Sequence, residues 1–444
     1  MQIYNTLSGQ KEIFKPLKKG KVSMYVCGVT VYDDCHIGHA RAYVAFDCIR
    51  SVFQYFGYDV TYVQNFTDID DKIINQALEE KIPFDEVAKK YTKSYYEDMD
   101  ALEVQRADLY PTVSENIENI IKFIQKIIDK KSAYVKNGNV YFDISSYKEY
   151  GQLSKRDTEQ LEAGARVEVI EEKQNPLDFA LWKIAKEGEP SWDSPWGKGR
   201  PGWHIECSVM GYENLGKQFD IHGGGRDLIF PHHENEIAQS IAHNKKIPAR
   251  YWLHNGFVNI NQEKMSKSLG NVFLLKDMFK KYDPMVVRYF LLHSQYRSPI
   301  DFSEQGIHDA QVGYNRLCEV MEIETKEIDD TKEIEKFKNE FEEFLADDCN
   351  SAGVIAVINE VIKYCNSTKS KNAQELIQTI IDVLGIKTQS TEIKLTDEQK
   401  RLLEERAQAR KNKDFKKSDE IRDQFLQQGL IIKDTPQGQE VKKS

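Results

Sequence analysis

The spacing of apolar and polar residues predicts alternating strands and helices over the first hundred residues. An apolar run at 24–26 is typical of a buried strand, and it leads into a glycine turn at Gly28. From His36 onward, apolar residues recur at the spacing of one helix face. A period-two pattern at 59–64 predicts a second strand, which is followed by another helix. This β-α-β order predicts a parallel, doubly wound sheet.

From about residue 101 to 200 the pattern changes. An isoleucine stripe over 116–130 predicts an amphipathic helix. Residues 132–143 are typical of a β-hairpin that turns on Asn137 and Gly138. We interpret residues 101–200 as an insertion between two halves of one nucleotide-binding fold.

The second half of that fold is predicted to begin near Pro201. A strand at 218–222 ends in three consecutive glycines at 223–225, a backbone that a ligand can approach closely. Pro231 predicts the start of the next helix, because proline suits the first helical position.

The C-terminal half is predicted to be mainly helical. A helix begins at Leu275, residues 311–385 are all-helical, and a last helical stretch covers 402–428. The polar residues 387–396 predict a linker before that stretch. Within the all-helical part, one apolar stripe is marked by Phe337, Phe341, Phe344 and Leu345.

Composition narrows the class of protein. A length of 444 residues allows about three domains. No apolar run approaches the ~20 residues of a membrane span, and the N-terminal residues do not resemble a secretory signal. Seven irregularly spaced cysteines in so long a chain favour reduced thiols and a cytoplasmic location. The net charge of −10 argues against indiscriminate nucleic-acid binding, but it leaves room for a local basic surface.

The first strand, its glycine turn and the following helix predict a phosphate site. The first amides of a helix have no internal partner, and the helix dipole favours an anion there. His36 and His39 lie i, i+3 on one face, so both rings can point at one oxyanion. Taken alone, the two histidines are equally compatible with a metal pair or with two ordinary surface residues. Cys27 ends the strand, at the sheet edge where open α/β folds bind ligands.

A metal site can be assembled from residues that lie far apart in the sequence. Cys27, Cys207, His232 and Glu236 offer two thiols, an imidazole and a carboxylate, and such ligands suit Zn²⁺. His232 and Glu236 are i, i+4 on one helix face, while His233 with Glu236 at i, i+3 is a competing choice. Buried unpaired cysteines and a histidine at a helix start are the alternative interpretation.

Three aspartates follow the second strand, at Asp68, Asp70 and Asp71. They offer oxygen ligands for a divalent cation. Carboxylates at the start of a helix also favour its dipole without any metal, and this is the simpler interpretation.

Two strings resemble the signature motifs of class I aminoacyl-tRNA synthetases. His36-Ile-Gly-His39 follows the first strand, and Lys264-Met-Ser-Lys-Ser268 lies far downstream, in the order that this class shows. Over nearly the whole chain the sequence is similar to the cysteinyl-tRNA synthetase family. The further segments that carry this likeness are Cys27-Gly28, Asn65-Phe-Thr-Asp-Ile-Asp-Asp-Lys72, Gly202-Trp-His-Ile-Glu-Cys207, His222-Gly-Gly-Gly225 and His232-His-Glu-Asn-Glu236.

The resemblance implies an α/β fold: a Rossmann-like doubly wound parallel sheet split by an insertion, then an α-helical bundle and a small C-terminal anticodon-binding domain. The predicted segments, in chain order, are the first half of the catalytic domain (1–100), the connecting insertion (101–200), the second half of the catalytic domain (201–250), a stem-contact region that bears the lysine-serine loop (251–310), the helical bundle (311–390) and the anticodon-binding domain (391–444).

The resemblance also implies the roles of individual residues. One zinc ion per subunit would be held by Cys27, Cys207, His232 and Glu236. The amino-acid substrate would be surrounded by Gly28, Thr67, Trp203 and His222. Catalysis would depend on His36, His39, Lys264 and Lys267, of which His36, His39 and Lys267 would contact ATP with its Mg²⁺.

The implied reaction is the activation of L-cysteine by ATP and its transfer to the terminal adenosine of tRNA(Cys), by a monomer. Zinc would distinguish cysteine from serine, since a pocket that senses only small apolar differences gains just ~1–3 kcal/mol. The tRNA would be contacted at its acceptor end and by the C-terminal domain.

The C-terminal end carries the weaker part of the likeness. Residues 400–422 are rich in Lys and Arg, which fits tRNA binding but also an ordinary solvated helix face. The family commonly has a tryptophan soon after the turn at Pro436, whereas this chain has Gln439-Glu-Val441, so the stacking of anticodon bases is in doubt.

Two other functions stay open at this point. One is a cysteine ligase that joins the same adenylate to an amino sugar; such relatives lack the C-terminal anticodon region. The other is a non-catalytic, synthetase-like regulator that binds tRNA.

Overall fold

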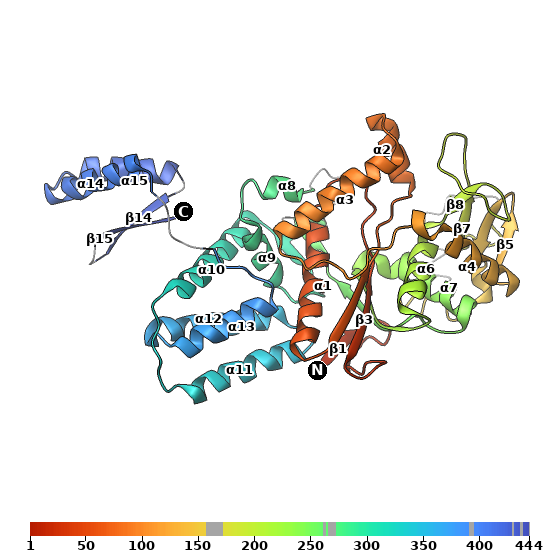
Figure 1. The fold of residues 1–444 in the computed structure, drawn as a ribbon, viewed down its shortest axis with the longest axis horizontal. Coiled ribbons are helices and arrows are strands. Elements are labelled where there is room, and N and C mark those ends of the chain that lie inside the picture. The colour runs from red at the N-terminus through yellow and green to blue at the C-terminus, as the bar shows by residue number, and fades with distance from the viewer. Residues whose placement is uncertain are drawn as a thin grey trace.

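The computed structural model describes residues 1–156, 172–260, 263–264, 272–389, 395–428, 430–435 and 438–443. In Figure 1, the parallel sheet stands at the centre, with the insertion on one side of it and the helical bundle on the other. The C-terminal module, at the blue end of the chain, lies beyond the bundle.

The central sheet has four parallel strands in the order β10-β9-β3-β4. Their bounds are Lys21–Val26 (β3), Asp59–Gln64 (β4), Phe219–Gly225 (β9) and Ala249–Asn255 (β10). Helix α1 (Ile37–Tyr55) connects β3 to β4 and is almost wholly buried. The predicted parallel, doubly wound sheet is therefore confirmed, and so is the helix that begins at His36.

The glycines of β9 correct one prediction. We expected the strand to end at His222, but Gly223 to Gly225 continue it and pair with β10. A side chain at Gly223 would have its Cβ 2.3 Å from the ring of Phe46 on α1. Gly223 thus allows α1 to pack directly on the strand.

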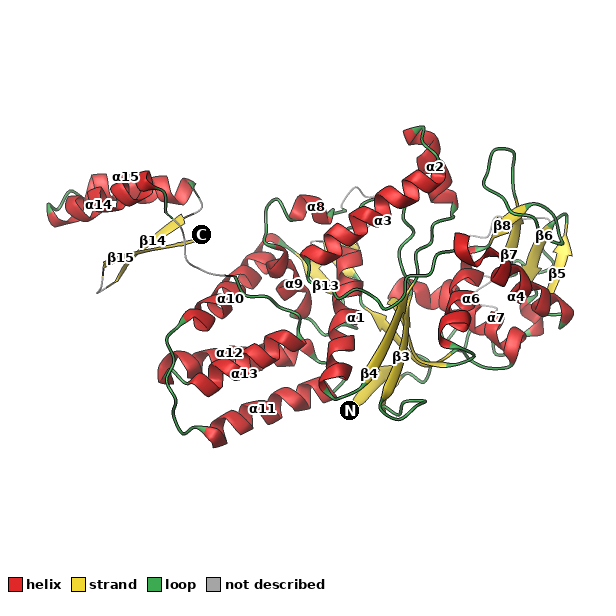
Figure 2. Ribbon diagram, in the orientation of Figure 1, coloured by secondary structure: helices red, strands yellow, loops and turns green. Residues whose placement is uncertain are grey.

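The described residues between 101 and 200 include helix α4 (Ile117–Asp129) and a separate antiparallel sheet (Figure 2). The strands of this sheet are β5 (Ala133–Lys136), β6 (Asn139–Phe142), β7 (Phe179–Ile184) and β8 (Gly199–Pro201). The predicted hairpin is confirmed. Its turn has positive φ at both Asn137 and Gly138, as a two-residue hairpin turn of this kind requires.

The helix that follows β9 does not begin at the predicted position. Helix α6 (Trp203–Leu215) precedes β9, and helix α7 runs over Glu234–Asn244. Pro231 does not open α7: it lies in a short π turn, Ile229–His233 (η4), inside which Phe230 is non-helical. His232 and His233 therefore belong to this turn, not to the helix that carries Glu236.

A small second sheet follows the central one. It has the order β12-β11-β13, with β11 (Val258–Ile260), β12 (Glu263–Lys264) and β13 (Ile300–Phe302). Residues 265–271, which hold most of the predicted lysine-serine loop, lie outside the described residues. Helices α8 (Leu275–Met278) and α9 (Pro284–Leu292) come next, so the helix predicted from Leu275 is confirmed as a short one.

The bundle consists of α10 (Glu304–Glu322), α11 (Thr331–Ala346), α12 (Ser351–Thr368) and α13 (Lys371–Val383). Phe337, Phe341 and Leu345 are buried, as predicted. Phe344 is an exception, because it is 36% exposed at the edge of α11, where it lies against Gly353. It therefore does not belong to the buried stripe.

The predicted last helical stretch is two helices, α14 (Asp397–Lys411) and α15 (Phe415–Gln427), separated by a turn in which Lys413 has φ 57°. A hairpin of β14 (Leu430–Thr435) and β15 (Gly438–Lys443) packs against them. Arg406 of α14 makes a bidentate ion pair with Asp434 of β14. This pair joins the helices to the hairpin.

The remaining regular elements are β1 (Gln2–Asn5), β2 (Gln10–Ile13), α2 (Asp71–Glu80), α3 (Phe84–Ala101) and the one-turn helices η1 (Ser114–Asn116), η2 (Ile144–Ser146) and η3 (Arg226–Leu228). Among the described helices, none combines the length and the apolar character that a membrane span needs.

Candidate active site

The four predicted metal ligands come together from four elements. Cys27 follows β3, Cys207 lies on α6, His232 lies in the π turn and Glu236 lies in the first turn of α7. One ligand atom from each falls within 4.8 Å of all the others, and all four residues are buried.

Two of the spacings within this cluster match those of a tetrahedral site. The two sulfurs are 3.7 Å apart, and Nε2 of His232 lies 3.2 Å from Oε1 of Glu236. Around one tetrahedral zinc, bond lengths of about 2.3 Å to sulfur and 2.0–2.1 Å to nitrogen or oxygen place two sulfurs about 3.8 Å apart and a nitrogen and an oxygen about 3.3 Å apart. The donor set and its geometry therefore fit zinc.

A second set of ligands overlaps the first. His222 and His233 could replace Cys207 and His232, while Cys27 and Glu236 would be kept. The second set has one sulfur instead of two. In it, Nε2 of His233 lies 3.3 Å from the Cys27 sulfur, and Nδ1 has an outer partner in Nε2 of His254 at 2.8 Å. Since Zn²⁺ is well served by two thiolates, the first set is the better fit.

Further side chains hold the ligands in place. Nε2 of His222 lies 2.9 Å from Oε2 of Glu236, and Nδ1 of His204 lies 3.1 Å from Nδ1 of His232. Metal-bound histidines and carboxylates usually have such outer partners. Sequence reasoning missed His204, although it stands three residues before Cys207 on the same helix.

Asn65 is a second residue that sequence reasoning missed. Its Oδ1 accepts a hydrogen bond from the Gly28 amide at 2.9 Å and lies 3.6 Å from the Cys207 sulfur. Its position directly after β4, at the carboxyl edge of the sheet, is the signal that could have found it.

Burial and mutual contact set the charges of the cluster. Burial raises the pKa of the Cys27 thiol, while a hydrogen bond from that thiol lowers the pKa of Cys207. Burial opposes charge on Glu236, but His222 and His232 outweigh it and lower the pKa of Glu236 to about 2. Burial also opposes charge on His232, yet hydrogen bonds to Cys207 and Glu236 raise its pKa. Metal binding at these residues would release protons, because thiolate and neutral imidazole are the binding forms.

The residues predicted to surround the amino acid lie around this cluster. Gly28 cannot carry a side chain, because a Cβ there would lie 1.5 Å from the Asn65 carbonyl oxygen. Trp203 is 40% exposed, and its ring lies 4.3 Å from that of His232. Thr67 is buried, and its hydroxyl donates to Glu206 at 2.8 Å. His222 is buried, and its Nδ1 has no hydrogen-bond partner among the described residues.

His36 and His39 cap the N-terminus of α1. Nδ1 of His36 accepts from the amides of Gly38 (3.1 Å) and His39 (3.3 Å), and Nδ1 of His39 accepts from the His36 amide (3.3 Å). The two rings stack with centroids 3.7 Å apart. Because each Nδ1 is an acceptor, each neutral ring carries its proton on Nε2. Both histidines thus present an Nε2–H donor at a helix N-terminus, where an anion is favoured.

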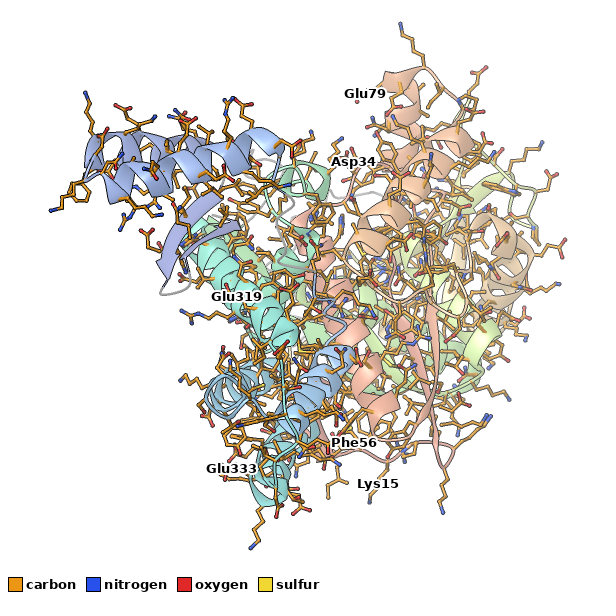
Figure 3. The ribbon with its side chains drawn as sticks, turned by 60° about the vertical axis from the view of Figure 1, so that its left-hand side comes forward. Lys15, Asp34, Phe56, Glu79, Glu319 and Glu333 are labelled. Carbon is orange, nitrogen blue, oxygen red and sulfur yellow. The ribbon has the colours of Figure 1, made fainter. Side chains whose placement is uncertain are left out.

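The backbone of residues 35–37 is joined to residues 273–275, which follow the lysine-serine loop. The Ile37 amide donates to the Phe273 carbonyl at 3.0 Å, and the Leu275 amide donates to the Cys35 carbonyl at 2.9 Å. Asp34, labelled in Figure 3, adds an ion pair with Lys276. The segment before His36 is therefore tied to the residues that follow that loop in the chain. Lys264 is placed only by its backbone in β12, and Lys267 lies outside the described residues.

The three aspartates after β4 face different partners. Asp70 caps α2 by accepting from the Lys72 amide at 2.9 Å. Asp68 accepts from the amides of Val113 and Ser114, and Asp71 pairs with Arg200 and Lys183. They belong to neither group of metal-compatible residues in the described part of the chain. The simpler interpretation, carboxylates at the start of a helix, fits these contacts.

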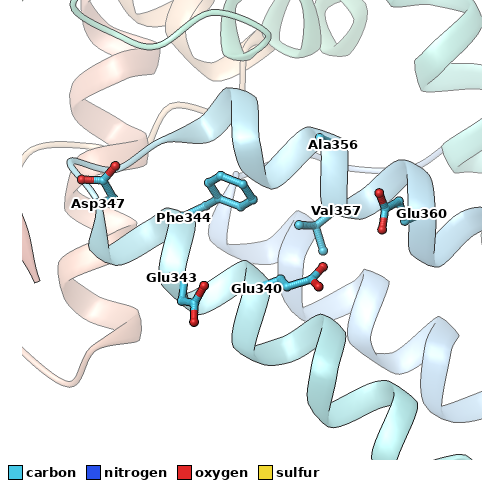
Figure 4. A pocket seen from close by; sticks show the side chains of 7 residues that line it. All are labelled: Glu340, Glu343, Phe344, Asp347, Ala356, Val357 and Glu360. Atoms are coloured by element: carbon cyan, nitrogen blue, oxygen red, sulfur yellow. The ribbon is translucent and has the colours of Figure 1, made fainter.

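A separate hollow lies between α11 and α12 of the bundle, with a volume of about 510 Å³ (Figure 4). Its lining includes the carboxylates of Glu340, Glu343, Asp347 and Glu360. Such a surface repels phosphates, so it does not suit ATP or a tRNA backbone.

The comparison with known proteins gives a consistent result. Residues 13–312 match the family described as tRNA synthetases class I (C) catalytic domain, and residues 393–441 match the Cysteinyl-tRNA ligase anticodon binding domain. A cysteine–tRNA ligase of Clostridioides difficile is 48% identical over 459 residues, and one of Carboxydothermus hydrogenoformans is 49% identical over 460 residues. Each match covers 99% of both chains.

Solved structures agree at the level of the fold. The methionyl-tRNA synthetase of Mycobacterium tuberculosis, in complex with methionyl-adenylate, superposes with a TM-score of 0.59 at 14% identity. That match covers 82% of this chain and 88% of the other.

Proposed function

This chain belongs to the cysteine–tRNA ligase family of class I synthetases, and from that premise we propose that it charges tRNA(Cys) with cysteine. The cysteine carboxylate attacks the α-phosphate of ATP, which gives cysteinyl-adenylate and pyrophosphate. A hydroxyl of the 3′-terminal adenosine of the tRNA then attacks the cysteinyl carbonyl, and AMP leaves. The observation that carries the proposal is the buried cluster of two thiols, an imidazole and a carboxylate in a chain of this family.

Cys27, Cys207, His232 and Glu236 would hold one zinc ion per subunit. When bound, zinc supplies a strong preference for thiolate over hydroxyl, which a purely apolar pocket cannot supply. The chain's own contribution is the orientation of these ligands: His222 fixes one oxygen of Glu236, and His204 lies against the second nitrogen of His232.

The amino-acid pocket would be formed by Gly28, Thr67, Trp203 and His222. Gly28 lets the backbone of Asn65 pack against the end of β3, since a Cβ there would lie 1.5 Å from the Asn65 carbonyl oxygen. Trp203 offers a partly exposed ring beside His232, against which a small substrate can pack.

His36 and His39 would stabilise the α-phosphate in the transition state. Their Nε2–H groups are fixed by the capping bonds of Nδ1, so no reorganisation is needed when negative charge develops. ATP would arrive with Mg²⁺, and Lys267, assisted by Lys264, would neutralise the pyrophosphate that leaves.

The C-terminal module would bind the anticodon end of the tRNA, and the acceptor end would reach the cluster. Residues 393–441 match the anticodon binding family, and this supports a tRNA acceptor over an amino-sugar acceptor. We propose a monomer that acts in the cytoplasm, where the seven free, buried cysteines would stay reduced.

Cysteine-dependent exchange of pyrophosphate into ATP tests the activation step, and zinc analysis on the same preparation tests the metal. We expect exchange with cysteine, at least a hundredfold less with serine, and about one zinc per chain. Absence of exchange would leave the regulator as the better proposal. Exchange without charging of tRNA(Cys) would favour the amino-sugar ligase.

A further inference from the structure

Arg41 is a buried cation that the roles assigned above do not use. It lies on α1, two residues after His39, and is 2% exposed. Within the described part of the chain it forms no ion pair with a carboxylate. A buried charge in such a position must be satisfied by other polar groups, or it would cost several kcal/mol.

Nη1 and Nη2 of its guanidinium donate to backbone carbonyls of one turn, whereas its buried Nε has no hydrogen-bond partner among the described residues. Nη1 donates to the Leu291 carbonyl, and Nη2 donates to the carbonyls of Gln295 (2.8 Å), Tyr296 (3.2 Å) and Ser298 (3.2 Å); the Ser294 carbonyl lies 3.3 Å from Nη2. Leu291 is in the last turn of α9, whose negative end also favours a cation. We call residues 291–298 the arginine-bound turn.

The arginine-bound turn is attached to the small second sheet. The Tyr296 carbonyl, which accepts from Arg41, also accepts from the Gly256 amide at 2.8 Å. A side chain at Gly256 would have its Cβ 2.3 Å from the Ser298 carbonyl oxygen, so the two backbones are in direct contact. Gly256 leads into β11, and the turn leads into β13, its parallel neighbour.

β11 also pairs with β12, and Asn259 faces Lys264 in that pairing. Arg41 thus connects the helix that begins at His36 and His39 with the sheet that carries Lys264. The connection consists of one side chain and two short backbone contacts.

We propose that Arg41 is a positioning residue for adenylate formation: it holds the β11–β13 sheet at a fixed place relative to His36 and His39. The inference rests on the proposed function, because it is the α-phosphate and the leaving pyrophosphate that these two parts must hold in line. Misplacement by an ångström lowers the rate of an aligned displacement strongly without preventing substrate binding.

Lysine cannot replace arginine in this role. Arg41 reaches five carbonyls with a planar fork of donors, whereas a lysine has three donors on one nitrogen. Arg41→Lys keeps the positive charge at the end of α9 but changes the hydrogen bonds to the arginine-bound turn. It therefore tests whether the rate depends on these hydrogen bonds or on the charge.

The test measures pyrophosphate exchange and single-turnover adenylate formation in Arg41→Lys, normalised to the burst amplitude so that only folded, active molecules count. We expect kcat for exchange to fall by about tenfold or more while the KM for cysteine stays within about twofold. The matched control is Arg288→Lys, which alters another fully buried arginine that donates to the carbonyls of Leu102 and Leu384 and pairs with Asp47. It should keep kcat within about twofold.

A second variant, Gly256→Ala, pushes the arginine-bound turn from the other side without touching Arg41. It should show the same loss of kcat at unchanged KM for cysteine. Wild-type rates in both Arg41→Lys and Gly256→Ala, or equal losses in Arg41→Lys and Arg288→Lys, would overturn the positioning role. Absence of exchange in the wild-type protein would instead overturn the proposed function.

Discussion

The two oxygens of Glu236 serve different partners: Oε2 lies 2.9 Å from Nε2 of His222, and Oε1 lies 3.2 Å from Nε2 of His232. His222 is therefore placed to orient Glu236, and in the proposed function it also lines the amino-acid pocket. Its other nitrogen, Nδ1, is buried and has no partner among the described residues. A polar atom left in this way is available to a bound molecule.

This relationship predicts the effect of His222→Leu on metal binding. Removal of the outer partner of a ligand typically costs 10–100-fold in metal affinity, so we expect about a tenfold weaker zinc affinity together with a higher KM for cysteine. Competition with a chromophoric chelator measures the first, and exchange assays measure the second. The control is His243→Leu, which removes a buried histidine stacked on Phe123, away from the cluster. Equal zinc affinity in all three proteins would contradict the orienting role.

Cys207→Ser tests the origin of selectivity. A serine hydroxyl is a poor zinc ligand, so this variant should hold zinc far more weakly and should discriminate poorly between cysteine and serine. The ratio of kcat/KM for the two amino acids in the exchange assay measures this. Cys365→Ser is the matched control, since Cys365 is equally buried in α12 but bonds only to the Ser370 carbonyl in the structure described here. Full discrimination in Cys207→Ser would refute zinc as the basis of selectivity.

The sequence predicted the parallel sheet, the insertion hairpin and the helix at His36, because each depends on short-range periodicity or on a two-residue turn. It also offered the four residues of the cluster as one metal site, but resemblance to a family was needed to favour this interpretation over unpaired buried cysteines. Spacing alone could not do this, because Cys27 and Cys207 are brought together by the pairing of β3 with β9 and by the packing of α6.

Other features were wrong or missed for reasons that the structure makes plain. The strand predicted at 218–222 continues through three glycines that pair with β10, and Gly223 among them lies against Phe46 of α1. The sequence predicted a helix start at Pro231. Instead, Pro231 lies in a π turn, and this turn directs His232 toward Cys207. The roles of Arg41 and Asn65 depend on contacts between distant parts of the chain, which no local pattern contains.

His36→Asn tests whether His36 contributes to adenylate formation in addition to capping α1. Asparagine is a good N-cap, and its Oδ1 can accept from the amides of Gly38 and His39 as Nδ1 does. We therefore expect the Tm to change little. The Nε2–H donor is lost, so the rate of adenylate formation should fall by about 10²–10³-fold, as when one donor to a developing oxyanion is removed. His36→Ala should lose both stability and rate. A full rate in His36→Asn would show that the ring acts only as a cap.

We predict that Asp98 makes the stability of the folded protein depend on pH. It is buried on α3, one of its oxygens has no hydrogen-bond partner among the described residues, and its charged neighbours are Asp34, Glu97 and Lys276. Burial, followed by repulsion from Asp34 and Glu97, raises its pKa from 3.8 to about 7.

Because the folded pKa of Asp98 is above the unfolded one, the folded protein binds more protons between these two values. The contribution of Asp98 to stability is therefore largest at low pH and is lost as the pH rises from about 4 to 7. Asp98→Asn removes the ionisation and can still accept from the Cys35 amide. It should raise the Tm by a few degrees at about pH 8, with a stabilisation of at most about 4 kcal/mol, and raise it clearly less at about pH 5, where the stabilisation is at most about 2 kcal/mol. Thermal unfolding followed at both pH values measures this difference. A constant difference between the two proteins at both pH values would mean that Asp98 does not titrate in this range.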